Sequence, residues 1–194
     1  MILPSIRAKL SHCFSRLLFA PTLMLVLMMY TVNGLAVDEI QEAPETLTIK
    51  EQDVAKVVIG MLRYTRWTSS PDPIKLCIVP PARYARLLTE STITLPSRRV
   101  DAKVVDFSPT KLLEQCDAVY FGNIKPDDQE LIIQSMQGKS ILTIAEDNKE
   151  CLRGSAFCLR IDNSGVAFDL NLDILARSNV QVNPNVLLLA KRKG

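Results

Sequence analysis

The feature that most restricts the fold of this chain is the alternation of short apolar runs with stretches of helical pattern. Residues 118–121 and 141–145 are apolar without polar alternation, which is typical of strands buried on both faces, and residues 74–79 form a further apolar run. Between them lies another strand pattern, at 100–105. Three helix signals also lie there, one at residues 82–88 and the other two at the helix openings Pro109 and Pro126. Strands joined through helices form right-handed crossovers and pair in parallel. The pattern therefore predicts an α/β fold with a mostly parallel, Rossmann-like sheet flanked by helices.

Both ends of this alternating region carry further signals. Apolar residues recur at helical spacing over 51–67, which predicts an amphipathic helix preceded by a loose acidic lead-in at 37–48. Residues 156–161 and 166–170 flank the turn-forming Asp162-Asn-Ser-Gly, which favours an antiparallel hairpin at one edge of the sheet. A last helix is expected after Asn183 as its cap, opened by Pro184.

The first 36 residues have the pattern of a secretory signal peptide. Three basic residues and no acid precede or flank an apolar run from Leu17 to Tyr30, and the small residues Gly34 and Ala36 follow. The run has about 14 residues, fewer than the roughly 20 that a membrane-spanning helix needs. The alternative is a retained anchor. We expect cleavage after Ala36, leaving residues 37–194 as a single exported domain.

Removal of the leader changes what chemistry the chain can perform. It leaves 20 of the 23 Lys and Arg residues against 21 Asp and Glu residues, a net charge of −1. The mature chain therefore lacks the excess of positive charge that is typical of nucleic-acid-binding proteins. The only histidine, His12, also leaves, which excludes Ser-His-Asp and Cys-His catalysis. Glycine-rich phosphate-binding motifs are absent too. We therefore expect no nucleic acid, no cofactor and no enzymatic activity.

Four cysteines remain after the leader, namely Cys77, Cys116, Cys151 and Cys158. An even number in an exported chain indicates two disulfides, although four cysteines allow three pairings. Without a Cys-x-x-Cys pair, thioredoxin-type exchange is disfavoured, and so is a four-cysteine zinc site. In the predicted fold, the positions of the cysteines on the strands favour disulfides between the near neighbours, Cys77 with Cys116 and Cys151 with Cys158. A redox sensor and a metal site are the alternatives.

Two clusters of polar side chains have both a structural and a functional interpretation. Arg63-Tyr-Thr-Arg-Trp67 at the end of the first predicted helix is either an aromatic pair with solvated arginines or the edge of a pocket that clamps a carboxylate. Asp127 and Asp128 suit the first turn of a helix. Glu146 begins an acidic segment that either solvates a loop or lines a crevice at the carboxyl ends of the strands.

The C-terminal segment is unusually apolar. Val186, Leu187, Leu188 and Leu189 are consecutive, so on a helix they point around most of the circumference and cannot all face one core. Either the segment is wedged between the sheet and a neighbouring helix, or at least one residue is an exposed anchor for a partner.

An ordered set of short motifs along nearly the whole mature chain resembles the YfiR family. The matching segments are Tyr64-Thr-Arg-Trp67, Leu76-Cys-Ile78, Cys116-Asp-Ala-Val-Tyr-Phe-Gly122, Cys151 through Gly-Ser-Ala-Phe-Cys158, Asn171-Leu-Asp173 with Arg177-Ser178, and Val182-Asn-Pro-Asn-Val-Leu-Leu-Leu-Ala190. Each segment alone is weakly specific, and the ordered set with all four cysteines is more so.

The resemblance implies a periplasmic repressor that forms homodimers with the same two disulfides. Its implied partners are the periplasmic region of an inner-membrane diguanylate cyclase (YfiN-like) and an outer-membrane lipoprotein (YfiB-like) that sequesters the repressor and relieves the inhibition. Family ligands resembling tryptophan and vitamin B6 imply ligand-binding roles for Arg66 and Asn183. Gln181 stands where a basic side chain is usual. The alternative function is a periplasmic small-molecule-binding sensor.

Overall fold

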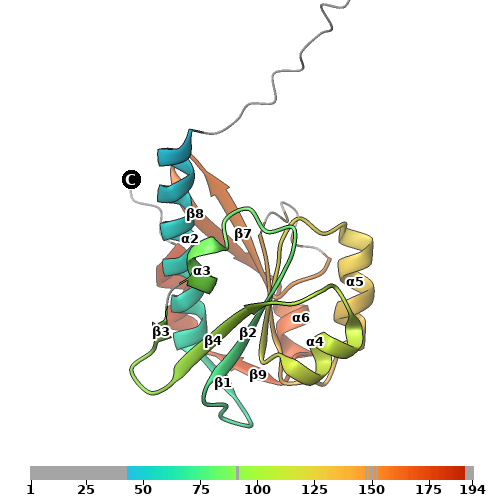
Figure 1. Cartoon of the computed structure of the whole chain (residues 1–194). Coiled ribbons are helices and arrows are strands. Elements are labelled where there is room, and N and C mark those ends of the chain that lie inside the picture. The colour runs from blue at the N-terminus through green and yellow to red at the C-terminus, as the bar shows by residue number, and fades with distance from the viewer. Residues whose placement is uncertain (1–42, 91, 147, 149–150, 152, 191–194) are drawn as a thin grey trace, which may run out of the picture. The chain divides into compact units, whose positions relative to one another are not determined.

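The fold is built on a seven-stranded sheet with the order β3-β4-β2-β5-β6-β7-β8 (Figure 1). The computed structural model describes residues 43–90, 92–146, 148, 151 and 153–190, so the predicted signal peptide lies outside the described residues. In chain order the strands are β2 (Ile74–Val79), β3 (Ile93–Thr94), β4 (Arg99–Val104), β5 (Ala118–Phe121), β6 (Leu142–Ala145), β7 (Phe157–Asp162) and β8 (Gly165–Leu170).

The strand directions confirm the predicted mixture of pairings. The five strands β4, β2, β5, β6 and β7 run parallel to one another. The outer strands β3 and β8 run antiparallel, and β8 forms the predicted hairpin with β7. In the hairpin turn, Ser164 N–H donates to Asp162 Oδ1 at 2.8 Å.

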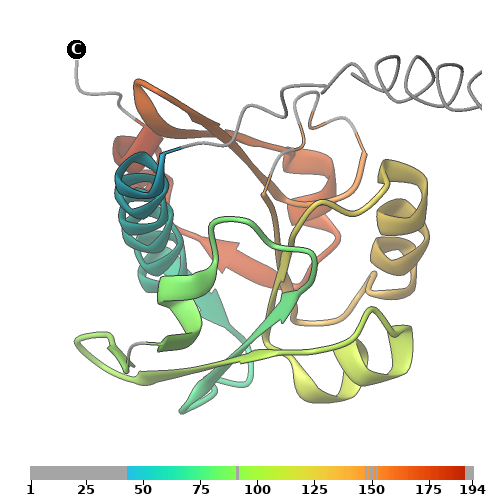
Figure 2. The ribbon, with the colours of Figure 1, turned by 45° about the horizontal axis from the view of Figure 1, so that its top comes forward.

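Helices cover both faces of the sheet (Figure 2). The long helix α2 (Pro44–Tyr64) and the short α3 (Arg86–Glu90) pack on one face, through residues such as Val58 and Leu88. On the other face lie α4 (Pro109–Gln115) and α5 (Pro126–Ser135). Every residue of β5 and β6 is buried, which explains the unalternated apolar runs in the sequence.

Proline opens three of these helices, as expected where a missing N–H has no cost. Pro109 and Pro126 begin α4 and α5, as predicted, and Pro44 begins α2. The prediction for α2 was wrong at both ends, since the helix starts before residue 51 and stops at Tyr64. The predicted helix at 82–88 is also displaced, because α3 spans Arg86–Glu90.

Four short elements were not predicted in this form. Strands β1 (Thr65–Trp67) and β9 (Val180–Val182) pair antiparallel in a separate ribbon. Helix α6 (Leu172–Ala176) follows β8, with Asn171 as its cap. The last helix, η1 (Pro184–Ala190), is a 3₁₀ helix. None of the described helices is long and apolar enough to cross a membrane.

Candidate functional site

The end of α2 places an arginine and a tryptophan on opposite sides of a strand. Thr65 Oγ1 donates to Met61 O at 2.7 Å, and the chain becomes extended at Thr65. In β1, Arg66 is exposed and Trp67 is buried, with its indole N–H donating to Asp117 O at 2.8 Å. Tyr64 and Trp67 are therefore not neighbours on one helical face, because Tyr64 ends α2 whereas Trp67 lies in β1, which pairs with β9.

A cavity of about 700 Å³, which we call the arginine cavity, opens beside this ribbon. The end of α2, the β1 strand and the turn after it, one residue of β9, and the connection between β3 and β4 form its wall. The lining residues are Leu62, Arg63, Thr65, Arg66, Trp67, Thr68, Ser70, Leu95, Pro96, Ser97, Arg98 and Gln181.

The charge of this cavity is entirely positive. Arg63, Arg66 and Arg98 line it, whereas none of its lining residues is acidic. In the described part of the chain, no carboxylate forms an ion pair with these three arginines. The Nη1 atom of Arg98 is buried and has no hydrogen-bond partner among the described residues. A buried donor without an acceptor is costly, so the geometry suits an anionic group such as a carboxylate.

The two residues with predicted ligand-binding roles lie in different surroundings. Arg66 lines the cavity and pairs in register with Gln181 across the ribbon. Asn183 is outside the cavity lining; its N–H donates to Tyr64 O, and its Oδ1 accepts from Asn185 N–H, both at 2.9 Å. Asn183 thus caps η1 and fastens it to α2. Its role in ligand binding remains a prediction.

The C-terminal apolar segment is divided between core and surface. Val186 is 1% exposed, and Leu189 packs at Gly60 of α2, where even an added Cβ would lie 2.5 Å from Leu189. Leu187 and Leu188 are 53% and 58% exposed. Two of the four predicted partner-binding residues are therefore exposed, and we call them the η1 leucine pair (Leu187 and Leu188).

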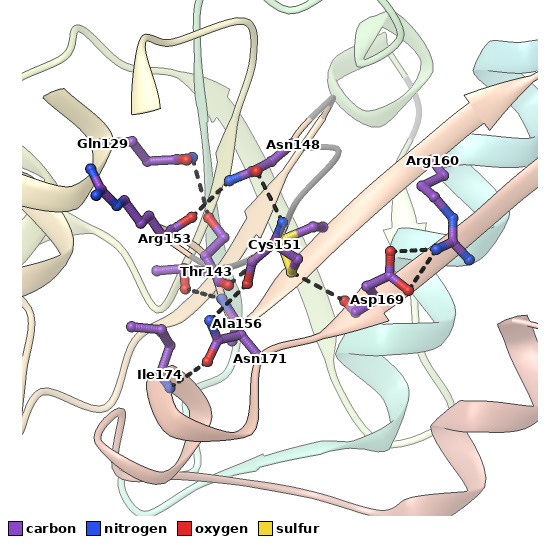
Figure 3. Close-up of a disulfide and its surroundings, with 12 residues drawn as sticks. Gln129, Thr143, Asn148, Cys151, Arg153, Ala156, Arg160, Asp169, Asn171 and Ile174 are labelled. Atoms are coloured by element: carbon purple, nitrogen blue, oxygen red, sulfur yellow. Dashed lines mark hydrogen bonds and ion pairs between the residues drawn. A yellow bond between two sulfur atoms is a disulfide. The ribbon is translucent and has the colours of Figure 1, made fainter. Parts of the chain in front are cut away.

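Two disulfides join the near-neighbour pairs that the sequence favours. Cys77 in β2 bonds to Cys116, just before β5, and Cys151 bonds to Cys158 in β7. The Cys151–Cys158 bond lies beside hydrogen bonds that join the backbone of Cys151 to the side chains of Asn148 and Asn171 (Figure 3). Asn171 Nδ2 donates to Cys151 O at 2.8 Å, while Asn171 Oδ1 accepts from Ile174 N–H at 3.0 Å and caps α6.

A buried carboxylate lies at the carboxyl end of β6. Glu146 is 3% exposed and accepts hydrogen bonds from Arg83 N–H at 2.7 Å, Tyr84 N–H at 3.2 Å and Tyr120 Oη at 2.9 Å. The expectation of a solvated loop residue was wrong for Glu146, because it holds the segment after β2. Burial, and then the negative charge of Glu146, raise the pKa of Tyr120 well above its ordinary value.

The segment after β2 also packs so closely against position 122 that only glycine fits there. A Cβ at Gly122, which follows β5, would lie 2.0 Å from Pro81 O, and Asn123 N–H donates to that oxygen at 2.7 Å. Backbone therefore packs on backbone at this end of the sheet. Across the described residues, no group of three or more His, Cys, Asp or Glu side chains could hold a metal ion.

A comparison with protein families places most of the chain in one family. A family model described as YfiR/HmsC-like matches residues 51–191, from α2 through η1. The match covers both disulfides and every residue that lines the arginine cavity. The chain belongs to the YfiR/HmsC-like family.

Proposed function

We propose that this chain is an exported repressor that binds the periplasmic region of an inner-membrane diguanylate cyclase and lowers cyclic di-GMP synthesis. An outer-membrane lipoprotein relieves the repression by sequestering the chain. In this proposal residues 1–36 are a signal peptide, residues 37–194 form one periplasmic domain, and the working form is a homodimer.

Family membership supports the coarser part of this function. The YfiR/HmsC-like match points to a periplasmic regulator of cyclic di-GMP signalling, and to a regulatory domain rather than a known enzyme family. The two disulfides are consistent with an oxidising compartment.

The observation that carries the partner-binding part is the η1 leucine pair. Leu187 and Leu188 expose more than half of their surface, although their neighbours Val186 and Leu189 anchor the same helix to the core. The helix is thus held in place by two residues and presents the other two to solvent. Apolar side chains on such a rigid support are suited to anchor a protein interface.

Replacing both members of the η1 leucine pair by alanine should abolish repression without unfolding the protein. Truncation of an interface anchor costs about 2 kcal/mol or more, equivalent to a roughly 30-fold weaker dissociation constant. The test measures cyclic di-GMP production by the membrane cyclase with purified Leu187→Ala/Leu188→Ala protein, together with its melting temperature.

The matched control is Leu131→Ala on α5, since Leu131 is 67% exposed and lies in a different element. This variant should repress normally, whereas Val186→Ala should lose stability because its side chain is buried. If the double variant represses as well as the unaltered protein, the cyclase binds elsewhere.

A second candidate function is a small-molecule sensor, and the Nη1 atom of Arg98, which has no acceptor among the described residues, favours it. A cavity with three arginines, no acidic lining residue and a buried guanidinium nitrogen without an acceptor is suited to a carboxylate ligand. The same cavity touches β9, which leads directly into η1.

Titration with L-tryptophan tests this second candidate, because its carboxylate can accept from an arginine. Arg98→Ala should weaken binding at least tenfold in calorimetry, since charged hydrogen bonds contribute about 1.5–3 kcal/mol. Arg99→Ala is the control, because Arg99 is the adjacent exposed arginine and does not line the cavity. Equal losses in both variants, or no binding by the unaltered protein, would exclude this sensor function for tryptophan.

A further inference from the structure

The polar side chains that line the arginine cavity are rich in hydrogen-bond donors. Arg63, Arg66 and Arg98 supply guanidinium groups, which carry several N–H donors and no acceptor. The other polar lining side chains are the hydroxyls of two serines and two threonines and the amide of Gln181. None of the lining side chains is a carboxylate. A ligand that enters this cavity therefore meets three positive charges and an excess of donors.

Several of these donors have no acceptor within the described part of the chain. Arg63 and Arg66 form no ion pair there, and the hydroxyls of Ser70 and Ser97, two exposed residues, form no hydrogen bond there. The Nη1 atom of Arg98 is buried and lacks a partner as well. A buried donor without an acceptor is costly, so a ligand oxygen at this atom would stabilise the folded protein.

This set of donors suits a phosphate group better than it suits an amino acid. A carboxylate carries one negative charge on two oxygens, whereas a phosphate monoester carries about −1.5 to −2 charges at pH 7 on three terminal oxygens. Arginine binds phosphate through two parallel N–H bonds. An amino acid also brings an ammonium group, which would lie among three guanidinium groups without a lining carboxylate to accept from it. Charge and hydrogen-bonding capacity both favour the phosphate.

The cavity has room for an organic group beside the phosphate. Its volume of about 700 Å³ lies within the range of roughly 300–1,000 Å³ that is typical of small-molecule sites. Leu62, Trp67 and Pro96 add apolar parts to the wall. Figure 1 shows this end of the molecule, where α2 ends beside β1 and β9. The cavity is therefore suited to a phosphate ester as well as to the free ion.

We propose that the arginine cavity binds a phosphate ester, with Arg98 donating to the phosphate from its buried Nη1 atom while Arg63 and Arg66 balance the remaining charge. The inference rests on the second candidate function, the small-molecule sensor, and names the chemical class of its ligand. Its central residue is Arg98, to which the family resemblance assigns no role. It does not depend on the η1 leucine pair.

Calorimetry of the unaltered mature protein with glycerol 3-phosphate tests the ligand class. This ester should bind at least about tenfold more tightly than acetate or L-tryptophan at the same pH and ionic strength, because it brings more charge and more acceptors. Inorganic phosphate should compete with it for the site. Added sodium chloride should weaken the binding, since Arg63 and Arg66 are exposed and salt screens exposed charges.

Variants at position 98 test the place of binding. Arg98→Ala should weaken the binding of glycerol 3-phosphate at least about tenfold, and Arg98→Lys should not restore it, because lysine keeps the charge but loses the two parallel bonds. Arg99→Ala is the matched control, since Arg99 is the adjacent exposed arginine and does not line the cavity. The melting temperature without ligand reports on folding. If the variants at position 98 do not fold, Arg63→Ala replaces them, because that side chain is exposed.

Vesicles distinguish the two sources of a phosphate group. Phosphatidylcholine vesicles are compared with vesicles that also contain phosphatidic acid, and bound protein is measured by sedimentation. A lipid headgroup in the cavity would retain the protein only on phosphatidic acid, and Arg98→Ala would release it. A soluble ester would give binding in calorimetry and none to either vesicle. Both results support a phosphate site, and they assign its ligand to the membrane or to solution.

Two outcomes would overturn the inference. If glycerol 3-phosphate and phosphatidic acid bind no better than acetate, the cavity does not select phosphate. Binding of tryptophan in that case would leave the sensor function standing with a carboxylate ligand. If Arg98→Ala and Arg99→Ala weaken the binding equally, the phosphate binds outside the cavity. Conversely, phosphate binding that leaves cyclase repression unchanged would support the site and contradict the sensor function.

Discussion

Replacing Cys77 and Cys116 together by alanine should lower the free energy of unfolding by about 4 kcal/mol in the chain-entropy treatment of disulfides. This bond closes a loop with a sequence separation of 39 residues, between two adjacent parallel strands of the central sheet. Because small domains are stable by about 5–15 kcal/mol, the loss is a large share of the total. Urea denaturation of the mature protein measures it.

The other disulfide provides the matched comparison. Cys151 and Cys158 are separated by only 7 residues, so their joint replacement should cost about 2.5 kcal/mol by the same treatment. If the short loop proves the more costly to open, local strain or packing outweighs chain entropy in this protein. Recovery of alkylated Cys77 from non-reduced protein would instead contradict the pairing.

Glu146→Ala should destabilise the fold by about 3 kcal/mol or more, because it removes the acceptor of three hydrogen bonds at once. Two of the donors are backbone groups of Arg83 and Tyr84, and the third is the hydroxyl of the fully buried Tyr120. Urea denaturation again gives the magnitude. Amide exchange at Arg83 and Tyr84 should accelerate more than exchange in β5.

Tyr120→Phe is the control, since it removes one donor and leaves the carboxylate bound to the backbone. It should cost about 1 kcal/mol near neutral pH. The raised pKa of Tyr120 means that the folded state retains the phenol proton, so this stabilisation is present below the ordinary tyrosine pKa and is lost as pH rises above it. The phenylalanine variant should therefore lose less stability at alkaline pH. Equal costs for both variants would show that Glu146 does not hold the segment after β2.

The parts of the fold that the sequence predicts are those with local causes. Strands β2 and β5 have the predicted bounds, because both are short apolar runs; all of β5 is buried, and so is all of β2 except Lys75. The proline openings of α4 and α5 and the turn at Asp162–Gly165 also depend on neighbouring residues alone.

Features that depend on distant residues could not be predicted. Residues 65–67 continue the helical pattern of α2, yet they become a strand because Val180–Val182 pairs with them. Glu146 looks like a loop acid in the sequence, and its burial follows from donors that lie 62 and 63 residues earlier. Arg98 has no local signal either, since the cavity forms only when the β3–β4 connection approaches β1.

Trp67 gives the molecule an intrinsic optical probe. It is the only tryptophan of the chain, it is 3% exposed, and its indole is hydrogen-bonded next to Cys116 through the carbonyl of Asp117. The same residue lines the arginine cavity. Intrinsic fluorescence therefore comes from one defined place in the fold, where an emission shift on unfolding and a quenching on ligand entry can both be observed without any label.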